Sequence, residues 1–301
     1  MPKFKIISDS SCDLPASVLE ENDISLVHYY VTLDGGLHYM KEYKEIMPEA
    51  FYDALRTQKS ITPKTSLPPI QDYIDAFRPA LENGQDVLCV CLTQKFSGSY
   101  QSAHNAVNLL KDEFPGRVVR IVDSRSVTIS QGILVMQAAQ LREKGLPIED
   151  AASIVEALAA ESRIIFTVDT LEYLQRGGRI GKVAAFTGTL LNIKPLIYMR
   201  DGELNPFSRV RGRHKALHEM VETAARDIGD EALKYTVWLV HADCLDELQA
   251  VCNELKQRHN IFPDPRCAVI GATIGTHIGP SAIGIAYILK PEFLKGREPI
   301  S

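Results

Sequence analysis

Short apolar runs followed by helical stripes recur along the first half of the chain. Residues 87–92 form a continuous apolar run, partly β-branched and flanked by polar residues, which predicts a buried strand. After it, apolar positions recur at the spacing of a helix with one buried face: Ala103, Ala106, Val107 and Leu110. The runs at 3–7 and 117–122 are likewise followed by predicted helices. This alternation predicts an α/β fold with a doubly wound, Rossmann-like parallel sheet, whose ligands bind beyond the carboxyl ends of its strands.

The segments between these units also carry local signals. Residues 24–47, with Asp34-Gly35-Gly36 inside them, predict two strands around a turn. TPKTSLPP at 62–69 is punctuated by prolines and predicts a stiff, extended loop. A helix is expected at 70–81.

From about residue 163 the apolar runs are separated by turns. These runs predict strands: RIIFTV, PLIYMRDGELNPFSRV, YTVWLVHA and CAVIGATIG. Asp201-Gly202, between two of them, is a hairpin signal. We therefore expect two domains, an α/β domain at 1–162 and an α+β domain at 163–301 with a mixed or antiparallel sheet. A chain of 301 residues suits such a division.

Composition narrows the class of protein. A net charge of −5 disfavours nucleic-acid binding, which usually needs a basic excess. No signal peptide and no integral membrane segment is expected, so we predict a cytoplasmic protein. The six cysteines show no CxxC pair or His cluster and are expected to be buried thiols. Neither a metal nor a cofactor is expected.

The turn after the strand at 87–92 has the chemistry of an anion site. Three residues occupy it: Ser97, Gly98 and Ser99. Free N–H groups and the positive end of a helix dipole meet there, and glycine permits close approach. The TPKTSLPP loop adds the hydroxyls of Thr65 and Ser66. Lys95 is the one cation beside FSGSYQSA, which favours a single carboxylate over a polyphosphate.

Other motifs allow further hypotheses. Asp9 and Asp123 follow two predicted strands and either converge on this site or cap helices and turns. RGGRIGK at 176–182 departs from a Walker loop at both ends and is expected to form an exposed basic turn. FSGS lacks the first glycine of a nucleophile elbow. His277 is expected in a Gly/Pro-rich loop with a functional role. An acyl hydrolase or transferase using Ser97 and His277 is the alternative to a binding protein.

An ordered set of motifs extends over nearly the whole chain: ISDSSCDLP, PKTSLPP, FSGSYQSA, RIVDSRS, LEYLQRGGRIGK, RVRGRHKAL, HADC and GTHIGPSAIG. In this order they resemble the DegV family, fatty-acid-binding proteins that include the binding subunit of bacterial fatty acid kinase. The resemblance implies a non-enzymatic bacterial lipid carrier with a long-chain fatty acid as ligand and no cofactor. It also implies an ATP-dependent kinase partner that converts the carboxylate to an acyl phosphate for phospholipid metabolism, with at most transient membrane contact.

The resemblance also assigns residues. In that family a threonine and a serine hold the carboxylate, here Thr65 and Ser97, and a histidine, here His277, joins their hydrogen-bond network. The rest of the expected head-group site is Ser66, Gly98 and Ser99. Contacts with the kinase are implied for four arginines: Arg176, Arg179, Arg209 and Arg211. Leu67 and Phe96 depart from the family's usual Gln and Leu, and we expect them to reshape the pocket mouth or the tail selectivity.

A buried acyl tail would supply the affinity. Each buried methylene contributes roughly 0.8 kcal/mol, so a tail of about fifteen yields on the order of 10 kcal/mol before ordering costs. The α/β domain is expected to carry the carboxylate-binding loops and the α+β domain to complete the ligand tunnel. The apolar segment 183–198 is a candidate lining for that tunnel.

Overall fold

The computed structural model describes residues 4–58, 61–186 and 192–294. Its first layer is the predicted parallel sheet, with four strands in the order β2-β1-β6-β7. The strands are β1 (Phe4–Asp9), β2 (Ile24–Val27), β6 (Asp86–Cys91) and β7 (Val119–Asp123). Because β1 and β6 are central neighbours, the turns that follow them open side by side at one edge of the sheet.

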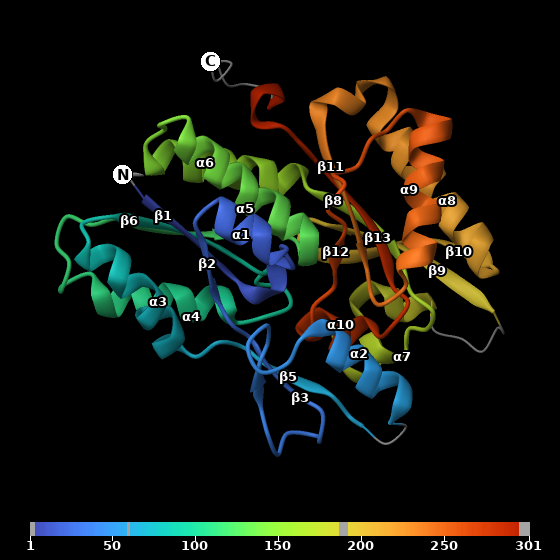
Figure 1. Cartoon of the computed structure of the whole chain (residues 1–301), viewed down its shortest axis with the longest axis horizontal. Helices are drawn as coiled ribbons and strands as arrows, with labels where there is room; N and C mark the ends of the chain where they lie inside the picture. Colours follow the sequence, from blue (N-terminus) through green and yellow to red (C-terminus); the bar gives the residue numbers. More distant parts are fainter. Residues whose placement is uncertain (1–3, 59–60, 187–191, 295–301) are drawn as a thin grey trace.

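Helices cover both faces of this sheet (Figure 1). Helices α3 (Ile70–Glu82) and α4 (Ser99–Leu110) lie on one face, and α5 (Thr128–Glu143) and α6 (Ile148–Glu161) on the other. The side chains of β6 alternate between the two layers: Cys89 and Cys91 pack with α3 and α4, whereas Leu88 and Val90 pack with α5 and α6. The sheet is therefore buried on both faces, as a doubly wound fold requires. The connection from β1 to β2 contains η1 (Ser10–Cys12) and α1 (Ala16–Glu21).

A small antiparallel sheet, β4-β3-β5, corrects two expectations. Its strands are β3 (Tyr30–Thr32), β4 (Met40–Lys41) and β5 (Lys64–Ser66). Residues 24–47 form three strands rather than two, because β2 joins the parallel sheet and the predicted turn connects β3 to β4. The segment expected to be a loop contains β5, which places Thr65 opposite Val31 of β3. Helix α2 (Pro48–Thr57) precedes β5.

The second half forms a six-stranded sheet in the order β10-β9-β8-β13-β11-β12. Its strands are β8 (Arg163–Thr167), β9 (Ile193–Arg200), β10 (Glu203–Arg211), β11 (Tyr235–His241), β12 (Ala268–Val269) and β13 (Ile283–Leu289). All described pairs are antiparallel except β11 with β12, which confirms the expected mixed sheet. The predicted hairpin is also confirmed. Asp201 and Gly202 turn it with φ of 54° and 78°, as a two-residue hairpin turn requires.

Helices also cover both faces of this second sheet. Helices α8 (Arg213–Ile228) and α9 (Leu245–His259) pack on its outer face. Helix α5 packs on its inner face against β11 and β13, so α5 lies between the two large sheets. The second half also contains three short helical turns: η2 (Gly181–Phe186), η3 (Gly229–Lys234) and η4 (Pro291–Phe293).

Helix α10 (Ala272–Ile278) joins the two halves of the chain. It lies beside α2 and the short helix α7 (Glu172–Arg176) (Figure 1). Gly275 faces α2, where an added Cβ would lie 2.8 Å from Phe51 and 2.6 Å from Tyr52. The hydroxyl of Tyr52 donates to the carbonyl of Ile270 at 2.9 Å. His277 therefore lies on a helix, not in the loop that the Gly/Pro-rich sequence predicted.

The expected domain boundary at 162/163 separates the strands of the two large sheets, since β8 is the first strand of the second. One hydrophobic core cluster nevertheless contains side chains from both halves, so the boundary stays a prediction. Within the described ranges, no helix has the length and apolar character needed to cross a membrane.

Candidate functional site

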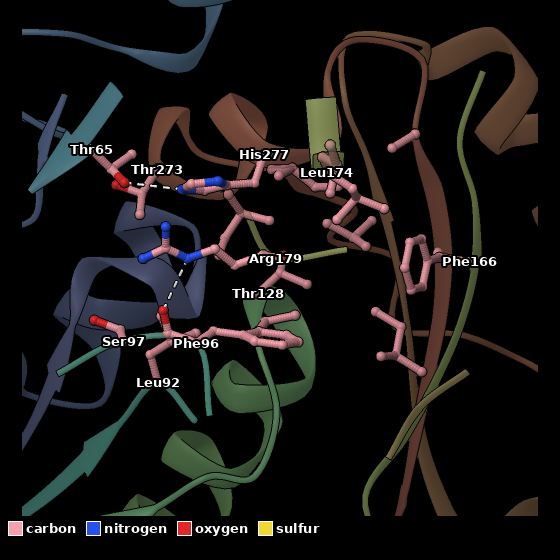
Figure 2. Close-up of a pocket in the computed structure, with 18 of the residues that line it drawn as sticks. Thr65, Leu92, Phe96, Ser97, Thr128, Phe166, Leu174, Arg179, Thr273 and His277 are labelled. Atoms are coloured by element: carbon pink, nitrogen blue, oxygen red, sulfur yellow. Dashed lines mark hydrogen bonds between the residues drawn. The ribbon is translucent and has the colours of Figure 1, made fainter. Parts of the chain in front are cut away.

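A cavity of about 260 Å³ lies where the three sheets meet. Its polar lining residues come mainly from the first half and from α10: Tyr29, Thr65, Ser66, Ser97, Thr128, Arg179, Thr273 and His277. Apolar residues of the six-stranded sheet line the other end: Ile164, Phe166, Leu204, Val240, Ile283 and Gly284. Figure 2 shows Phe166 across the cavity from Thr65 and Ser97. A ligand with one polar head and an apolar tail matches this polarity.

Ser97 lies in the turn between β6 and α4, as predicted. Its Oγ accepts hydrogen bonds from the hydroxyl of Tyr29 at 2.7 Å and from the N–H of Ser99 at 3.2 Å. Burial and the nearby Asp9 raise the pKa of Tyr29 well above its usual value, so Tyr29 remains a donor. Because both acceptor positions of Oγ are used, the proton of Ser97 is left to donate to a group in the cavity.

Thr65 and His277, which are 212 positions apart in the sequence, are in contact. The Thr65 Oγ1 and His277 Nε2 atoms are 3.0 Å apart. Nδ1 of His277 is buried and has no hydrogen-bond partner among the described residues. A buried N–H without an acceptor costs more than an unpaired ring nitrogen, so the proton belongs on Nε2, where it donates to Thr65. The Thr65 hydroxyl then keeps its own proton for a ligand.

The turn after α7 packs directly against His277. A Cβ added to Gly177 would lie 2.1 Å from Nδ1 of His277, so only glycine allows the turn to come this close. Burial, with a smaller effect from the positive charge of Arg179, lowers the pKa of His277 to about 4. His277 is therefore neutral near pH 7.

Arg179, expected to face a partner, lines the cavity mouth. Its Nε donates to the carbonyl of Phe96 at 3.2 Å and its Nη1 to the carbonyl of Gly177 at 2.8 Å. Figure 2 shows its guanidinium between His277 and Ser97. No carboxylate of the described ranges pairs with it, so its charge is available to an anion. The polar end of the cavity therefore contains a positive charge beside its hydroxyl groups.

Gly98 and Ser99 lie beside the cavity rather than in its lining. A Cβ on Gly98 would be 3.2 Å from Leu67, so the absence of a side chain here allows the residue after β5 to pack closely. The hydroxyl of Ser99 donates to the buried carboxylate of Asp9 at 3.1 Å. Asp9 also accepts from the N–H of Leu92 at 2.8 Å, so it ties the turn to the sheet. The carboxylate of Asp123 accepts a hydrogen bond from the N–H of Arg125 in its own turn, which fits the capping interpretation.

The other arginines assigned to a partner lie outside the cavity lining. Arg176 forms an ion pair with Glu172 on α7 at 2.6 Å. Arg209 stacks on the ring of Phe186, with its guanidinium carbon 4.1 Å from the ring centroid. Arg211 is exposed at the end of β10. All three are accessible to another protein.

Two buried carboxylates hold the start of α10. Glu42 accepts from the N–H of Thr273 at 2.7 Å and from its hydroxyl at 2.9 Å. Asp13 accepts from the N–H of Gly271 at 3.0 Å and from the hydroxyl of Thr128 at 2.5 Å. Burial raises the pKa of both carboxyls, and their mutual repulsion raises that of Asp13 further. The pair fixes α10, and with it His277, relative to the small sheet.

The segment 183–198 does not line the cavity in its described part, 183–186 and 192–198. The side chains of β9 belong to the sheet cores on either side, as Leu196 and Ile197 illustrate. The described part of this segment therefore does not form the predicted lining. The apolar end of the cavity is lined instead by residues of β8, β10, β11 and β13.

The geometry does not suit an acyl hydrolase. Nε2 of His277 is engaged with Thr65 rather than Ser97, and no carboxylate of the described chain orients Nδ1. The lowered pKa also makes this imidazole a weak general base. The arrangement is suited to holding a carboxylate by hydroxyl donors and one guanidinium.

Away from the cavity, one cluster combines groups that can ligate a metal. His218 and Glu222 on α8 and Glu254 on α9 place ligand atoms within 4.8 Å of one another. Arg258 already pairs with both glutamates, at 3.2 Å and 2.8 Å. These contacts join α8 to α9 without an ion.

Solved structures resemble the chain over nearly its full length. A stearic acid-binding protein from Eubacterium ventriosum has a TM-score of 0.92 at 34% identity, covering 97% of this chain and all of that one. A DegV family protein from Thermus thermophilus, described as fatty acid binding, has a TM-score of 0.86 at 30% identity, covering 95% and 99%. DegV of Bacillus subtilis, described as a fatty acid binding protein, has a TM-score of 0.84 at 27% identity, covering 96% and 100%.

Sequence comparison gives the same relationship. A DegV domain-containing protein of Clostridium perfringens is 32% identical over 289 residues, 96% of this chain and 98% of that protein. Residues 3–290 match the family described as "Uncharacterised protein, DegV family". The chain belongs to the DegV family.

Proposed function

We propose that this protein is a cytoplasmic carrier of a long-chain fatty acid, which it presents to an ATP-dependent kinase for conversion to an acyl phosphate. The observation that carries the proposal is the polarity of the cavity. Hydroxyl donors and a guanidinium lie at one end, and the apolar face of the six-stranded sheet lies at the other. Two similar proteins of known structure are described as binding stearic acid and fatty acid, which supports the same ligand class here.

In this proposal the carboxylate accepts from Thr65 and Ser97. Each hydroxyl has its acceptor role filled, by His277 and by Tyr29 respectively, so each has a proton to give. Arg179 at the mouth adds a charge-assisted contact. The head group therefore stays at the cavity mouth, where a second protein can reach its oxygens.

The ligand test begins with protein purified from cells. The protein is denatured, and the organic extract is analysed by mass spectrometry. We expect about one long-chain acid per chain, with a delipidated and reloaded sample as the control for losses during purification. An extract without acid, together with no binding of added acid by the delipidated protein, would refute the proposal.

The head-group residues are tested with the double variant Thr65→Ala/Ser97→Ala. Each hydrogen bond to a charged group contributes about 1.5–3 kcal/mol, so displacement of a fluorescent fatty acid should show that affinity is weaker by at least about 100-fold. Thr57→Ala, which removes an exposed hydroxyl of α2, is the matched control and should bind normally. Equal affinity of the double variant would exclude these residues from the head-group site.

The kinase step is supported by the exposed arginines that the family resemblance assigns to a partner, among them Arg209 and Arg211. Charge reversal in Arg209→Glu/Arg211→Glu should slow acyl phosphate formation by a bacterial fatty acid kinase while leaving fatty-acid affinity unchanged. Arg226→Glu on α8 is the control for charge. If the double reversal and the control are phosphorylated at the same rate as the wild type, these arginines are not the partner surface.

A further inference from the structure

The apolar end of the cavity contains one position of the six-stranded sheet that has no side chain. Strand pairing places Gly284 of β13 directly opposite Phe166 of β8 and Val240 of β11. All three residues line the cavity. They form a row across the sheet in which glycine, without a side chain, lies between two larger residues.

The backbone does not require glycine at this position. Gly284 is absent from the glycines with positive φ, so an alanine fits its conformation. Glycine inside a strand usually weakens the sheet and marks a place where another group comes close. A Cβ there would lie 3.1 Å from the side chains of both Ile164 and Val240, closer than ordinary contact. An added side chain must therefore displace these two residues, which themselves line the cavity.

The next row of the same sheet face closes the cavity. Ala286 pairs with Ile164 and Trp238, and Ile164 pairs with Met199. In this row Ile164 and Leu204, which pairs with Met199, line the cavity, while Ala286, Trp238 and Met199 are fully buried in the core. The cavity therefore ends within one row of Gly284. Figure 2 shows Phe166, its neighbour in the row, across the cavity from Thr65, Ser97 and His277.

We propose that Gly284 sets the length of the acyl tail that the cavity accepts, with the methyl end of the tail resting on this glycine between Phe166 and Val240. The inference depends on the proposed fatty-acid function and adds the residue that determines chain-length specificity. Since the head group is fixed at Thr65 and Ser97, the distance from there to the Gly284 row limits how many methylenes are buried. In a close-packed cavity, each carbon added to position 284 displaces about one carbon of the ligand.

The test compares delipidated wild type with Gly284→Ala and Gly284→Val. Affinities for unbranched saturated acids of graded length are measured by displacement of a fluorescent fatty acid. The acid that the wild type prefers should bind Gly284→Ala about fourfold more weakly, the equivalent of about 0.8 kcal/mol for one methylene. Gly284→Val adds three carbons, so it should bind it about tenfold or more weakly and should prefer an acid about three carbons shorter. Val240→Ala enlarges the same end and should move the preference toward longer acids.

Ile285→Val is the matched control. Ile285 is the next residue of β13, but it packs on the opposite face of the sheet and does not line the cavity. The variant Ile285→Val removes one buried methylene and therefore measures the effect of weakening the strand alone. Its chain-length preference should equal that of the wild type.

Three results would overturn the inference. The first is a Gly284→Val variant that keeps the wild-type preference. The second is a Gly284→Val variant that binds all acids equally more weakly without changing their order, which would indicate a distorted strand. The third is an Ile285→Val variant that shifts the preference as much as Gly284→Val does. If the wild type binds no acid of any length, the proposed function itself fails, and the length inference fails with it.

Discussion

The glycine pair after α7 allows a sharp test of how His277 is positioned. Gly177 has an ordinary helical φ of −76°, so Gly177→Ala introduces no backbone strain. Its new Cβ would nevertheless lie 2.1 Å from Nδ1 of His277, whereas ordinary contacts begin at 3.4 Å. The ring or the turn must therefore move by about 1.3 Å. Either movement disturbs the head-group site, because the ring holds Thr65 through a 3.0 Å contact and the turn carries Arg179.

The neighbouring glycine is the control for this variant. Gly178 has φ of +69° and no atom within 4 Å of an added Cβ. Gly178→Ala should cost about 1 kcal/mol of folding stability through backbone strain and should leave affinity unchanged. Gly177→Ala should in addition bind the fatty acid about tenfold more weakly, the loss of about one hydrogen bond. Fluorescent displacement and urea unfolding measure the two quantities. Equal affinity of both variants would refute the role of His277 in positioning Thr65.

Three further outcomes follow from the contacts of the site. Tyr29→Phe removes the donor to Ser97, so affinity should fall about fivefold in the same displacement assay with no change in the circular dichroism spectrum; unchanged affinity would show that Tyr29 does not orient Ser97. The pKa of His277 is lowered to about 4, so its contribution to stability is complete above pH 6.5 and is lost as the pH falls towards 4. Between pH 7 and 4.5 the wild type should lose about 2 to 3 kcal/mol more free energy of unfolding than His277→Gln, and parallel curves from urea titrations would contradict this. Glu42→Ala leaves both donors of Thr273 unpaired and should lower the free energy of unfolding by about 3 kcal/mol, whereas the near-isosteric Glu42→Gln should cost less; equal losses would exclude the carboxylate contacts as the cause.

Local periodicity was sufficient to predict the strand, turn and helix around Ser97. The change from a continuous apolar run to a helical stripe marks the turn between them, and the parallel sheet follows from repetition of the unit. The β9–β10 hairpin was predictable for a similar reason, because Asp201-Gly202 can adopt the positive φ that its turn needs. Such features depend on residues close together in sequence.

Features that depend on tertiary partners were not predictable in this way. Helix α10 has seven residues with a glycine at its centre, and the N–H groups at its start are held by Asp13 and Glu42 from the other half of the chain. Strand β5 has three residues and exists because β3 pairs with it. The sequence around Tyr29 did not indicate a role in the site, since aromatic residues beside strands are common. Its role became visible only when its hydroxyl was found on Ser97.

The packing of α10 on α2 has a consequence for the order in which the protein folds during synthesis. The side chains of Phe51 and Tyr52 are completely buried, and Gly275, from the second half of the chain, is part of what covers them. While a ribosome has produced only the first half, these aromatic rings lack that cover. The nascent chain therefore keeps an unfinished apolar surface until α10 has emerged, and the cavity is completed only then.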